Sequence, residues 1–303
     1  MPIQPMLQLA RPKEWVKNVI VFMPIVFGLQ MRNSNAWLQA FLAAVAFCLA
    51  SSSAYIINDI KDRQSDRSHP AKKKRPLASG QISTNAAVIE AVVLMLLALG
   101  LAQSLSFILT LMIFTYLLLQ ICYTMFMKNR ILIDVICIAL GFVVRTASGA
   151  VAIEVAASPW LFICIFTICL FMGFCKRYSE VVTIGDKTAV GNHRPTLIAY
   201  TPELLTHLIT LSAGIAVVAF LVYGLNEKTV RQFGTNYFIY TLPAVVYAVF
   251  RFAMLSMKGT YAGPTDIFIH DRPFQVTILI WWVLILVIIR FGSQLNLWLQ
   301  GLY

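Results

Sequence analysis

The sequence is dominated by apolar runs that are about as long as a lipid bilayer is thick. Runs near twenty residues recur along the whole chain, and charged residues make up only 12% of it. About twenty apolar residues in an α-helix cross the hydrocarbon core of a bilayer. Because the runs are continuous rather than alternating, strands are excluded as the main element. We therefore expect an all-α, polytopic membrane protein.

The distribution of basic residues predicts how the chain lies in the membrane. Eighteen of the 24 lysines and arginines fall in the N-terminal segment and in the connections after the second, fourth, sixth and eighth spans. Cytoplasmic loops of membrane proteins carry such an excess. The loops 58–84, 176–204 and 258–273 are therefore predicted to face the cytoplasm, from the inner (cytoplasmic) membrane. We therefore expect the basic residues to set the orientation in the membrane and to bind an anionic ligand. No nucleic-acid partner is expected. The nine predicted spans are 17–31, 36–57, 85–103, 106–127, 131–153, 158–175, 205–225, 236–257 and 274–292.

The first long loop begins with acidic residues and continues with basic ones. Asn58, Asp62 and Asp66 are spaced by four, so on a helix they lie along one face. Such oxygen ligands suit Mg²⁺, which takes one or two carboxylates and completes its coordination with water and phosphate oxygens. Lys72 and Arg75 can bind the phosphate. A diphosphate ester is the predicted ligand; the alternative is a solvated loop whose bases only set membrane orientation.

The second long loop carries a similar mixture of charges. Lys176, Arg177 and Arg194 can bind phosphate oxygens. Glu180 and Asp186 could support a second metal ion. A structural ion pair between Glu180 and the bases one turn before it explains Glu180 equally well.

Ionisable residues inside the spans are a further signal, because they are costly there and often functional. Asp134 lies near one end of the fifth span, and Arg145 lies eleven residues deeper. A rise of about 16 Å separates them on a helix, so Arg145 is expected to find an anion elsewhere. Tyr123 and Lys128 end the fourth span, either as interfacial anchors or as substrate contacts. Arg251 is expected to extend its side chain to the interface.

Two motifs in the first loop identify a resemblance. They are Asn58-Asp59-x-x-Asp62-x-x-x-Asp66 and Arg75-Pro76-Leu77-Ala78-Ser79-Gly80. Together they resemble the first signature of the UbiA superfamily of intramembrane prenyltransferases.

Four further segments narrow the resemblance to the decaprenyl-phosphate phosphoribosyltransferase branch of that superfamily. They are Arg11-Pro12-x-Glu14-Trp15-x-Lys17-Asn18, Asp66-Arg67-x-His69-Pro70, Gly141-Phe142-Val143-Val144-Arg145 and His193-Arg194-Pro195. One departure agrees with this branch. Ordinary UbiA prenyltransferases carry Asp-x-x-x-Asp in the later loop, where this chain has Lys176-Arg177-Tyr178-Ser179-Glu180. Fewer acids and more bases suit a donor that carries an extra phosphate.

The resemblance implies one UbiA-like transmembrane domain over residues 1–303, with a cavity that faces the cytoplasm. It implies Mg²⁺ as the cofactor, and phosphoribosyl diphosphate (PRPP) and a polyprenyl phosphate as substrates for cell-envelope biogenesis. The expected catalytic residues are Asn58, Asp59, Asp62 and Asp66, with Asn58, Asp62 and Asp66 as the metal ligands. The expected substrate-binding residues are Lys17, Lys72, Arg75, Tyr123, Lys128, Asp134, Arg145, Lys176, Arg177, Glu180 and Arg194.

Two other functions remain open at this point. One is a UbiA-type prenyltransferase that moves a prenyl group from a prenyl diphosphate to an aromatic acceptor. The other is a secondary transporter that carries an anionic solute through the same basic cavity.

Overall fold

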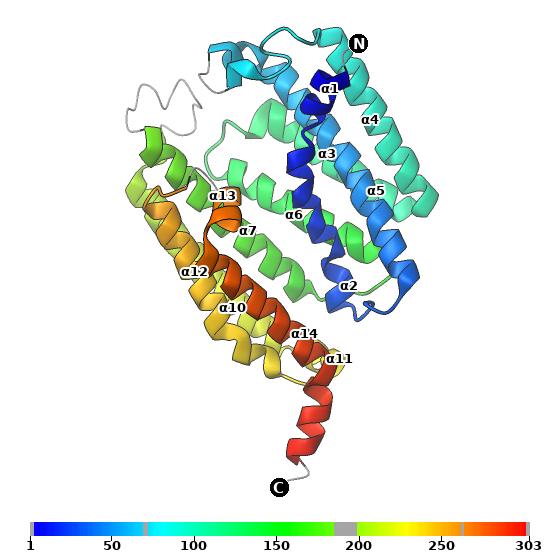
Figure 1. Ribbon diagram of the computed structural model, residues 1–303, viewed down its shortest axis with the longest axis vertical. Helices are drawn as coiled ribbons and strands as arrows, with labels where there is room; N and C mark the ends of the chain where they lie inside the picture. The colour runs from blue at the N-terminus through cyan, green and yellow to red at the C-terminus, as the bar shows by residue number, and fades with distance from the viewer. Residues whose placement is uncertain (1–2, 69–71, 185–198, 262–263, 301–303) are drawn as a thin grey trace. The chain divides into compact units, whose positions relative to one another are not determined.

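The computed structural model describes residues 3–68, 72–184, 199–261 and 264–300 (Figure 1). Among these residues the regular elements are all helical, as the apolar runs predicted. The chain divides into two compact units, Met1–Ala157 and Ser158–Tyr303. Whether residues 1–303 act as one UbiA-like domain stays a prediction.

The first unit contains α1 (Ile3–Ala10), η1 (Pro12–Phe22), α2 (Met23–Phe27), α3 (Ser34–Ser68), η2 (Lys72–Lys74), α4 (Thr84–Leu105), α5 (Phe107–Cys122), η3 (Tyr123–Met127) and α6 (Ile133–Ala152). The second unit contains α7 (Pro159–Ile184), α10 (Pro202–Leu225), α11 (Glu227–Phe233), η4 (Tyr237–Thr241), α12 (Leu242–Met257), α13 (Pro264–His270) and α14 (Arg272–Gln300).

Eight helices in the described part of the chain are long and apolar enough to cross a membrane. This confirms an integral, multi-pass membrane protein. Each unit supplies four of them. The eight segments are Ser34–Ser68, Thr84–Leu105, Phe107–Met127, Ile133–Ala152, Pro159–Val182, Pro202–Leu225, Tyr237–Met257 and Arg272–Asn296.

The first predicted span, 17–31, is not a single long helix, so the prediction of nine helical spans is wrong at this position. A 3₁₀ helix, η1, carries the chain to Phe22, and the short helix α2 then begins with Pro24 in its first turn. Proline is tolerated in the first turn of a helix but not in its interior. The apolar run is therefore divided into two short elements.

Helix α3 is the central element of the first unit and packs against η1, α4, α5 and α6 (Figure 1). Its buried face is lined by small residues, including the fully buried Ala40, Ala43, Ala46 and Ala50. Small side chains let membrane helices approach one another closely. Phe47 fills the remaining space and meets the ring of Tyr116 edge-on, with the centroids 5.3 Å apart.

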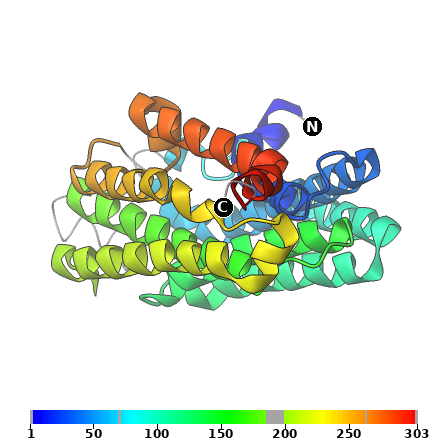
Figure 2. The ribbon, with the colours of Figure 1, turned by 90° about the horizontal axis from the view of Figure 1, so that it is seen from below.

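In the second unit α7 and α10 lie side by side (Figure 2). The Ser179 hydroxyl donates to the Ser256 carbonyl over 3.1 Å and so ties α7 to α12. Arg251 of α12 binds Asp271 through two hydrogen bonds of 2.6 and 2.9 Å. The sequence did not predict this carboxylate partner, and the expected extension of Arg251 to the interface stays a prediction.

The predicted loops are partly helical. The first eleven residues of loop 58–84 continue α3, which ends at Ser68, and loop 176–204 begins as the last turns of α7, which ends at Ile184. Loop 258–273 contains α13. The change from apolar to polar sequence at these positions therefore does not coincide with the end of the helix.

Candidate active site

The polar end of α3 forms the centre of the candidate site. At 35 residues the helix is roughly 50 Å long, whereas the hydrocarbon core of a bilayer is about 30 Å thick. Its apolar part ends at Ile57, so the turns that carry residues 58–68 can extend beyond the hydrocarbon. We call Asn58, Asp59, Asp62 and Asp66, with their cationic partners, the α3 acid cluster.

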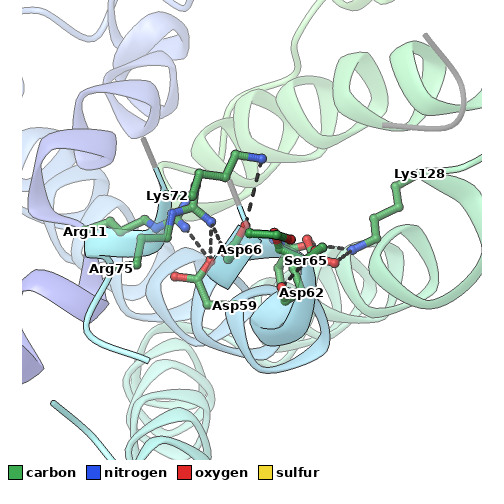
Figure 3. A network of polar contacts seen from close by, with 10 residues as sticks. Arg11, Asp59, Asp62, Ser65, Asp66, Lys72, Arg75 and Lys128 are labelled. Atoms are coloured by element: carbon green, nitrogen blue, oxygen red, sulfur yellow. Dashed lines mark hydrogen bonds and ion pairs between the residues drawn. The ribbon is translucent and has the colours of Figure 1, made fainter. Parts of the chain in front are cut away.

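Two buried carboxylates of the α3 acid cluster share cationic partners (Figure 3). Arg75 bridges them, because its Nη1 lies 3.0 Å from Oδ1 of Asp59 and 2.7 Å from Oδ2 of Asp66. Arg11 donates to the same Oδ1 of Asp59. Lys72 lies 4.0 Å from Asp66 and is 40% exposed at its side chain. Buried carboxylates need such partners, since an unpaired charge would be costly there.

The segment that carries Arg75 is held by apolar packing on α3. Leu77 and Ile82 are buried in a cluster with Leu9 and Ile56. The Ser79 amide donates to the Arg75 carbonyl over 2.8 Å, which closes the turn. The sequence therefore fixes Arg75 over the carboxylates by placing apolar anchors shortly after it.

Arg11 is a site residue that the sequence analysis did not select, although it opens one of the resembling motifs. It joins α1 to η1 in the left-handed backbone region, with φ at 53°. That conformation costs about 1–2 kcal/mol for a non-glycine residue. Arg11 and the predicted substrate ligand Lys17 both lie over the ring of Tyr55, at 5.3 and 5.9 Å from its centroid. Lys17 also pairs with Glu14.

A second part of the α3 acid cluster gathers around Lys128. The Lys128 ammonium donates to Oδ1 of Asp62 and, over 3.3 Å, to Oδ1 of Asn58 (Figure 3). Two of the three predicted metal ligands therefore direct oxygen atoms at one cation. The third, Asp66, binds Arg75 and Lys72 instead. Its role as a metal ligand stays a prediction.

The donor set around Lys128 suits Mg²⁺. Two oxygen atoms from successive turns of α3 already converge on a cation, which is the arrangement that a hard metal ion requires. In the described ranges no group of three or more His, Cys, Asp or Glu residues could hold a metal. Asn58 and Asp62 would thus hold an ion that water and substrate phosphates complete.

Arg145 forms a separate buried cluster with neutral partners, which we call the Arg145 cluster. It donates to Asn18 Oδ1 over 2.8 Å, to the Tyr116 hydroxyl over 2.7 Å and to the Gly141 carbonyl over 3.1 Å. The partners come from η1, α5 and α6 itself. The sequence predicted an anionic partner for Arg145, but all three of these acceptors are uncharged. Its role in substrate binding stays a prediction.

The remaining predicted residues of the first unit lie beside these clusters. Tyr123 begins the π-helical turn η3, whose C-cap is Lys128. Asp134 is fully buried in the first turn of α6, where the helix dipole favours a negative charge. Substrate contacts of Tyr123 and Asp134 stay predictions.

In the second unit, the structure confirms the predicted structural pairing of Glu180. Arg177, which is buried, donates to Oε2 of Glu180, and Lys176 lies 3.9 Å from Oε1. Arg194 and Asp186 lie outside the described residues. Binding of phosphate by Lys176 and Arg177, and a substrate or metal contact by Glu180, stay predictions.

Comparison with known proteins identifies relatives of this chain. A decaprenyl-phosphate phosphoribosyltransferase of Corynebacterium glutamicum is 31% identical, over 91% of this chain and 84% of the relative. The enzyme of that name from Mycobacterium tuberculosis (strain H37Rv) is 30% identical, over 93% of both chains. A solved UbiA homolog from Archaeoglobus fulgidus, bound to GPP and Mg²⁺, shares the fold at a TM-score of 0.73 and 17% identity, over 94% of this chain and 99% of its own.

The chain also matches the profile of the UbiA prenyltransferase family. That match covers residues 19–269, which include Asn58, Asp62, Asp66, Arg145 and the Lys176–Glu180 segment. The family consists of transferases. The chain therefore belongs to the UbiA prenyltransferase family, as a membrane-embedded transferase on the branch of the decaprenyl-phosphate phosphoribosyltransferases.

Proposed function

We propose that this protein transfers the 5-phosphoribosyl group of PRPP to a polyprenyl phosphate and releases diphosphate. The observation that carries the proposal is the α3 acid cluster, where an oxygen pair suited to Mg²⁺ stands beside two guanidinium groups and two lysines. Such a set can hold a diphosphate through its metal and through its own charges. The relatives named as phosphoribosyltransferases support this donor.

The chemistry asks little of the protein beyond holding and orienting charge. The C1–O bond of the ribose breaks toward the diphosphate, and an oxygen of the lipid phosphate forms the new bond to C1. That oxygen is already anionic, so no general base is needed. A bound Mg²⁺ would neutralise charge on the leaving diphosphate. Asn58 and Asp62 would hold this ion, with Asp66 as a further predicted ligand, and Asp59 orients Arg75 and Arg11.

The cations bind the phosphates in this proposal. Arg75 and Lys72 contact the donor, and Lys17 with Arg11 offers positive charge around Tyr55. Lys176, Arg177 and Arg194 stay predicted phosphate ligands. Tyr123, Lys128, Asp134 and Arg145 stay predicted substrate contacts, and the site is proposed to face the cytoplasm from the inner membrane.

A prenyl transfer to an aromatic acceptor is the second candidate. The Archaeoglobus fulgidus homolog, which was solved with a prenyl diphosphate and Mg²⁺, favours it. The pairing of Glu180 with Lys176 and Arg177 favours the phosphoribosyl donor instead. Those bases neutralise the acid that stands where ordinary family members carry the second acidic motif, and so leave less negative charge for a second metal ion.

Transfer of a label between water and lipid tests the proposal. Purified protein receives PRPP labelled in the ribose, a polyprenyl phosphate and Mg²⁺, and the label is measured in the lipid phase. We expect transfer that EDTA abolishes and that Asp62→Asn lowers by at least about 100-fold. Glu227→Gln is the matched control, because this exposed carboxylate pairs with Arg231 on the same short helix, α11, and takes no part in the candidate site.

Two results would contradict the proposal. One is prenylation of an aromatic acid from a prenyl diphosphate in a preparation that moves no phosphoribosyl group. The other is gradient-dependent uptake of an anion without chemical conversion, which would indicate the transporter.

A further inference from the structure

Lys128 makes the longest-range polar contact of the α3 acid cluster. Lys128 directly follows the span Phe107–Met127, yet its ammonium reaches Asn58 and Asp62, which lie 70 and 66 positions earlier in the chain. Its side chain is only 13% exposed, while that of Asp62 is 28% exposed. The ammonium is therefore held inward, and the carboxylate it binds stays open to solvent or ligand.

The backbone around Lys128 departs from a regular helix on both sides. Before it, η3 (Tyr123–Met127) is a π-helical turn, and the Lys128 amide donates to the Tyr123 carbonyl over 2.9 Å. After it, Leu132 has a positive φ of 67°, which is unusual for a residue other than glycine. A π turn adds one residue, which turns the following side chain by about 100° around the axis. This irregular segment therefore decides that Lys128 points at α3.

We propose that Lys128 is the resident cation of the metal site, and that a metal ion must displace it before binding Asn58 and Asp62. The displaced ammonium then binds a phosphate of the donor. The first step rests only on the geometry of Lys128, and the second step rests on the proposed function.

Charge explains why both cations cannot occupy the site together. A divalent ion that takes the same two oxygen atoms would lie within about 4 Å of the ammonium, where like charges repel by several kcal/mol in a partly buried site. A metal ion alone thus binds weakly, because it must separate the Lys128 ammonium from Asn58 and Asp62. A diphosphate supplies an anion that the displaced ammonium can bind. Metal and diphosphate should therefore strengthen each other's binding, and by the same factor.

Two simpler roles for Lys128 make different predictions. A lysine that only binds phosphate has no effect on the metal when diphosphate is absent. A lysine that only stabilises the acidic end of α3 would leave the site less ordered when removed, so that metal binding weakens. Only a displaced resident cation predicts that its removal tightens metal binding.

Binding of Mn²⁺, followed by electron paramagnetic resonance of the free ion, separates these roles without any turnover. The full-length protein in detergent is titrated with and without inorganic diphosphate. For the natural protein we expect weak binding alone and clearly tighter binding with diphosphate. For Lys128→Met we expect Mn²⁺ alone to bind about tenfold more tightly, with little further gain from diphosphate. Lys128→Arg keeps the charge and should behave like the natural protein.

Lys72→Met is the matched control, since it removes the same charge beside Asp66 rather than beside Asn58 and Asp62. We expect it to change the affinity for Mn²⁺ alone by less than about threefold, because its exposed side chain is screened by water. If Lys128→Met does not yield folded protein, Lys128→Gln keeps a hydrogen-bond donor for Asp62 and replaces it.

Unchanged or weaker binding of Mn²⁺ alone to the folded Lys128 variant would overturn the inference. An equal gain in Lys72→Met would also overturn it, by showing a general charge effect. The Mn²⁺ titration needs neither PRPP nor lipid. Failure of phosphoribosyl transfer with these affinities as expected would therefore reject the proposed function and leave the role of Lys128 standing.

Discussion

Two groups of guanidinium side chains in the first unit have partners that differ in charge. Arg11 and Arg75 share the carboxylates of Asp59 and Asp66. Arg145 is 4% exposed and donates to an amide oxygen, a hydroxyl and a backbone carbonyl. The first arrangement neutralises charge, whereas the second only satisfies hydrogen-bond donors.

This difference separates a place where ligands can act from a place that holds elements together. In the α3 acid cluster each ionised group is oriented by others, so an added metal ion or phosphate can rearrange the pairs. The Arg145 cluster binds η1 to α5 and α6 through short neutral contacts, and Asn18 continues it to Ser51 over 3.3 Å. We therefore expect substitutions in the Arg145 cluster to act on stability, and substitutions in the α3 acid cluster to act on transfer.

The largest effect is expected for Arg145→Met. It leaves three buried acceptors without their donor, and we expect a loss of about 3 kcal/mol in the free energy of unfolding. Thermal unfolding in detergent measures it. Arg290→Met is the matched control, because Arg290 is exposed on α14. A rise of more than about tenfold in KM for the polyprenyl phosphate, with unchanged stability, would instead assign Arg145 to the lipid phosphate.

Gly149→Ala should disturb the Arg145 cluster, although Gly149 is not itself one of its members. A Cβ at this position would lie 2.1 Å from the Val21 carbonyl oxygen, so η1 would have to move away from α6. We expect a loss of about 2 kcal/mol, measured in the same unfolding experiment.

Gly100→Ala is the control for this substitution. A Cβ at Gly100 would meet nothing within 4 Å, so alanine should stabilise α4 by roughly 0.5–1 kcal/mol. Equal effects of the two substitutions would show that the approach of η1 to Gly149 is not tight.

Asp59→Asn should break the α3 acid cluster while keeping its shape. The amide removes the charge that Arg11 and Arg75 share, so both guanidinium groups lose their orientation toward the donor. We expect kcat to fall about tenfold with a loss of stability below about 1 kcal/mol. A loss of stability without any change in kcat would place Asp59 with the Arg145 cluster, as a purely structural residue.

Local patterns were enough to predict the helices and the composition of the site. Apolar runs of bilayer length located the eight long helices, and the spacing of Asn58 and Asp62 placed their oxygens on one face of α3. The same reasoning predicted one helix over the run 17–31, because hydropathy does not register that η1 ends at Phe22 and that α2 begins there with Pro24 in its first turn.

Long-range pairing could not be predicted in the same way. Arg145 meets Asn18 across 127 positions, and Lys128 meets Asp62 across 66. Such partners depend on how helices pack and on the π turn before Lys128, and neither has a periodic signal in the sequence. Asp66 is a further example: its spacing placed it on one face with Asn58 and Asp62, but did not predict that Arg75, on a separate segment, donates to its carboxylate.

The smallest effect is expected for a reference pair outside both clusters. In the second unit the Arg251 guanidinium holds the pKa of the Asp271 carboxyl below its ordinary value. A lowered pKa means that this carboxylate stabilises the fold above about pH 4, and that the stabilisation is lost as the pH falls through the lowered pKa. Asp271→Asn should therefore cost about 1 kcal/mol at pH 7 and leave transfer unchanged.

Two comparisons sharpen this last test. Thermal unfolding of the natural protein and Asp271→Asn should converge only once the pH has fallen through the lowered pKa of Asp271, because the natural carboxyl is then neutral as well. Asp271 also accepts from the Phe274 amide over 2.9 Å at the start of α14, a cap that asparagine can keep and alanine cannot. Asp271→Ala should thus stay less stable at low pH, which separates the cap from the ion pair. If the natural protein and Asp271→Asn differ in stability by the same amount at every pH, the charge of Asp271 does not contribute to the stability. The pair of Arg251 and Asp271 would then resemble the neutral Arg145 cluster.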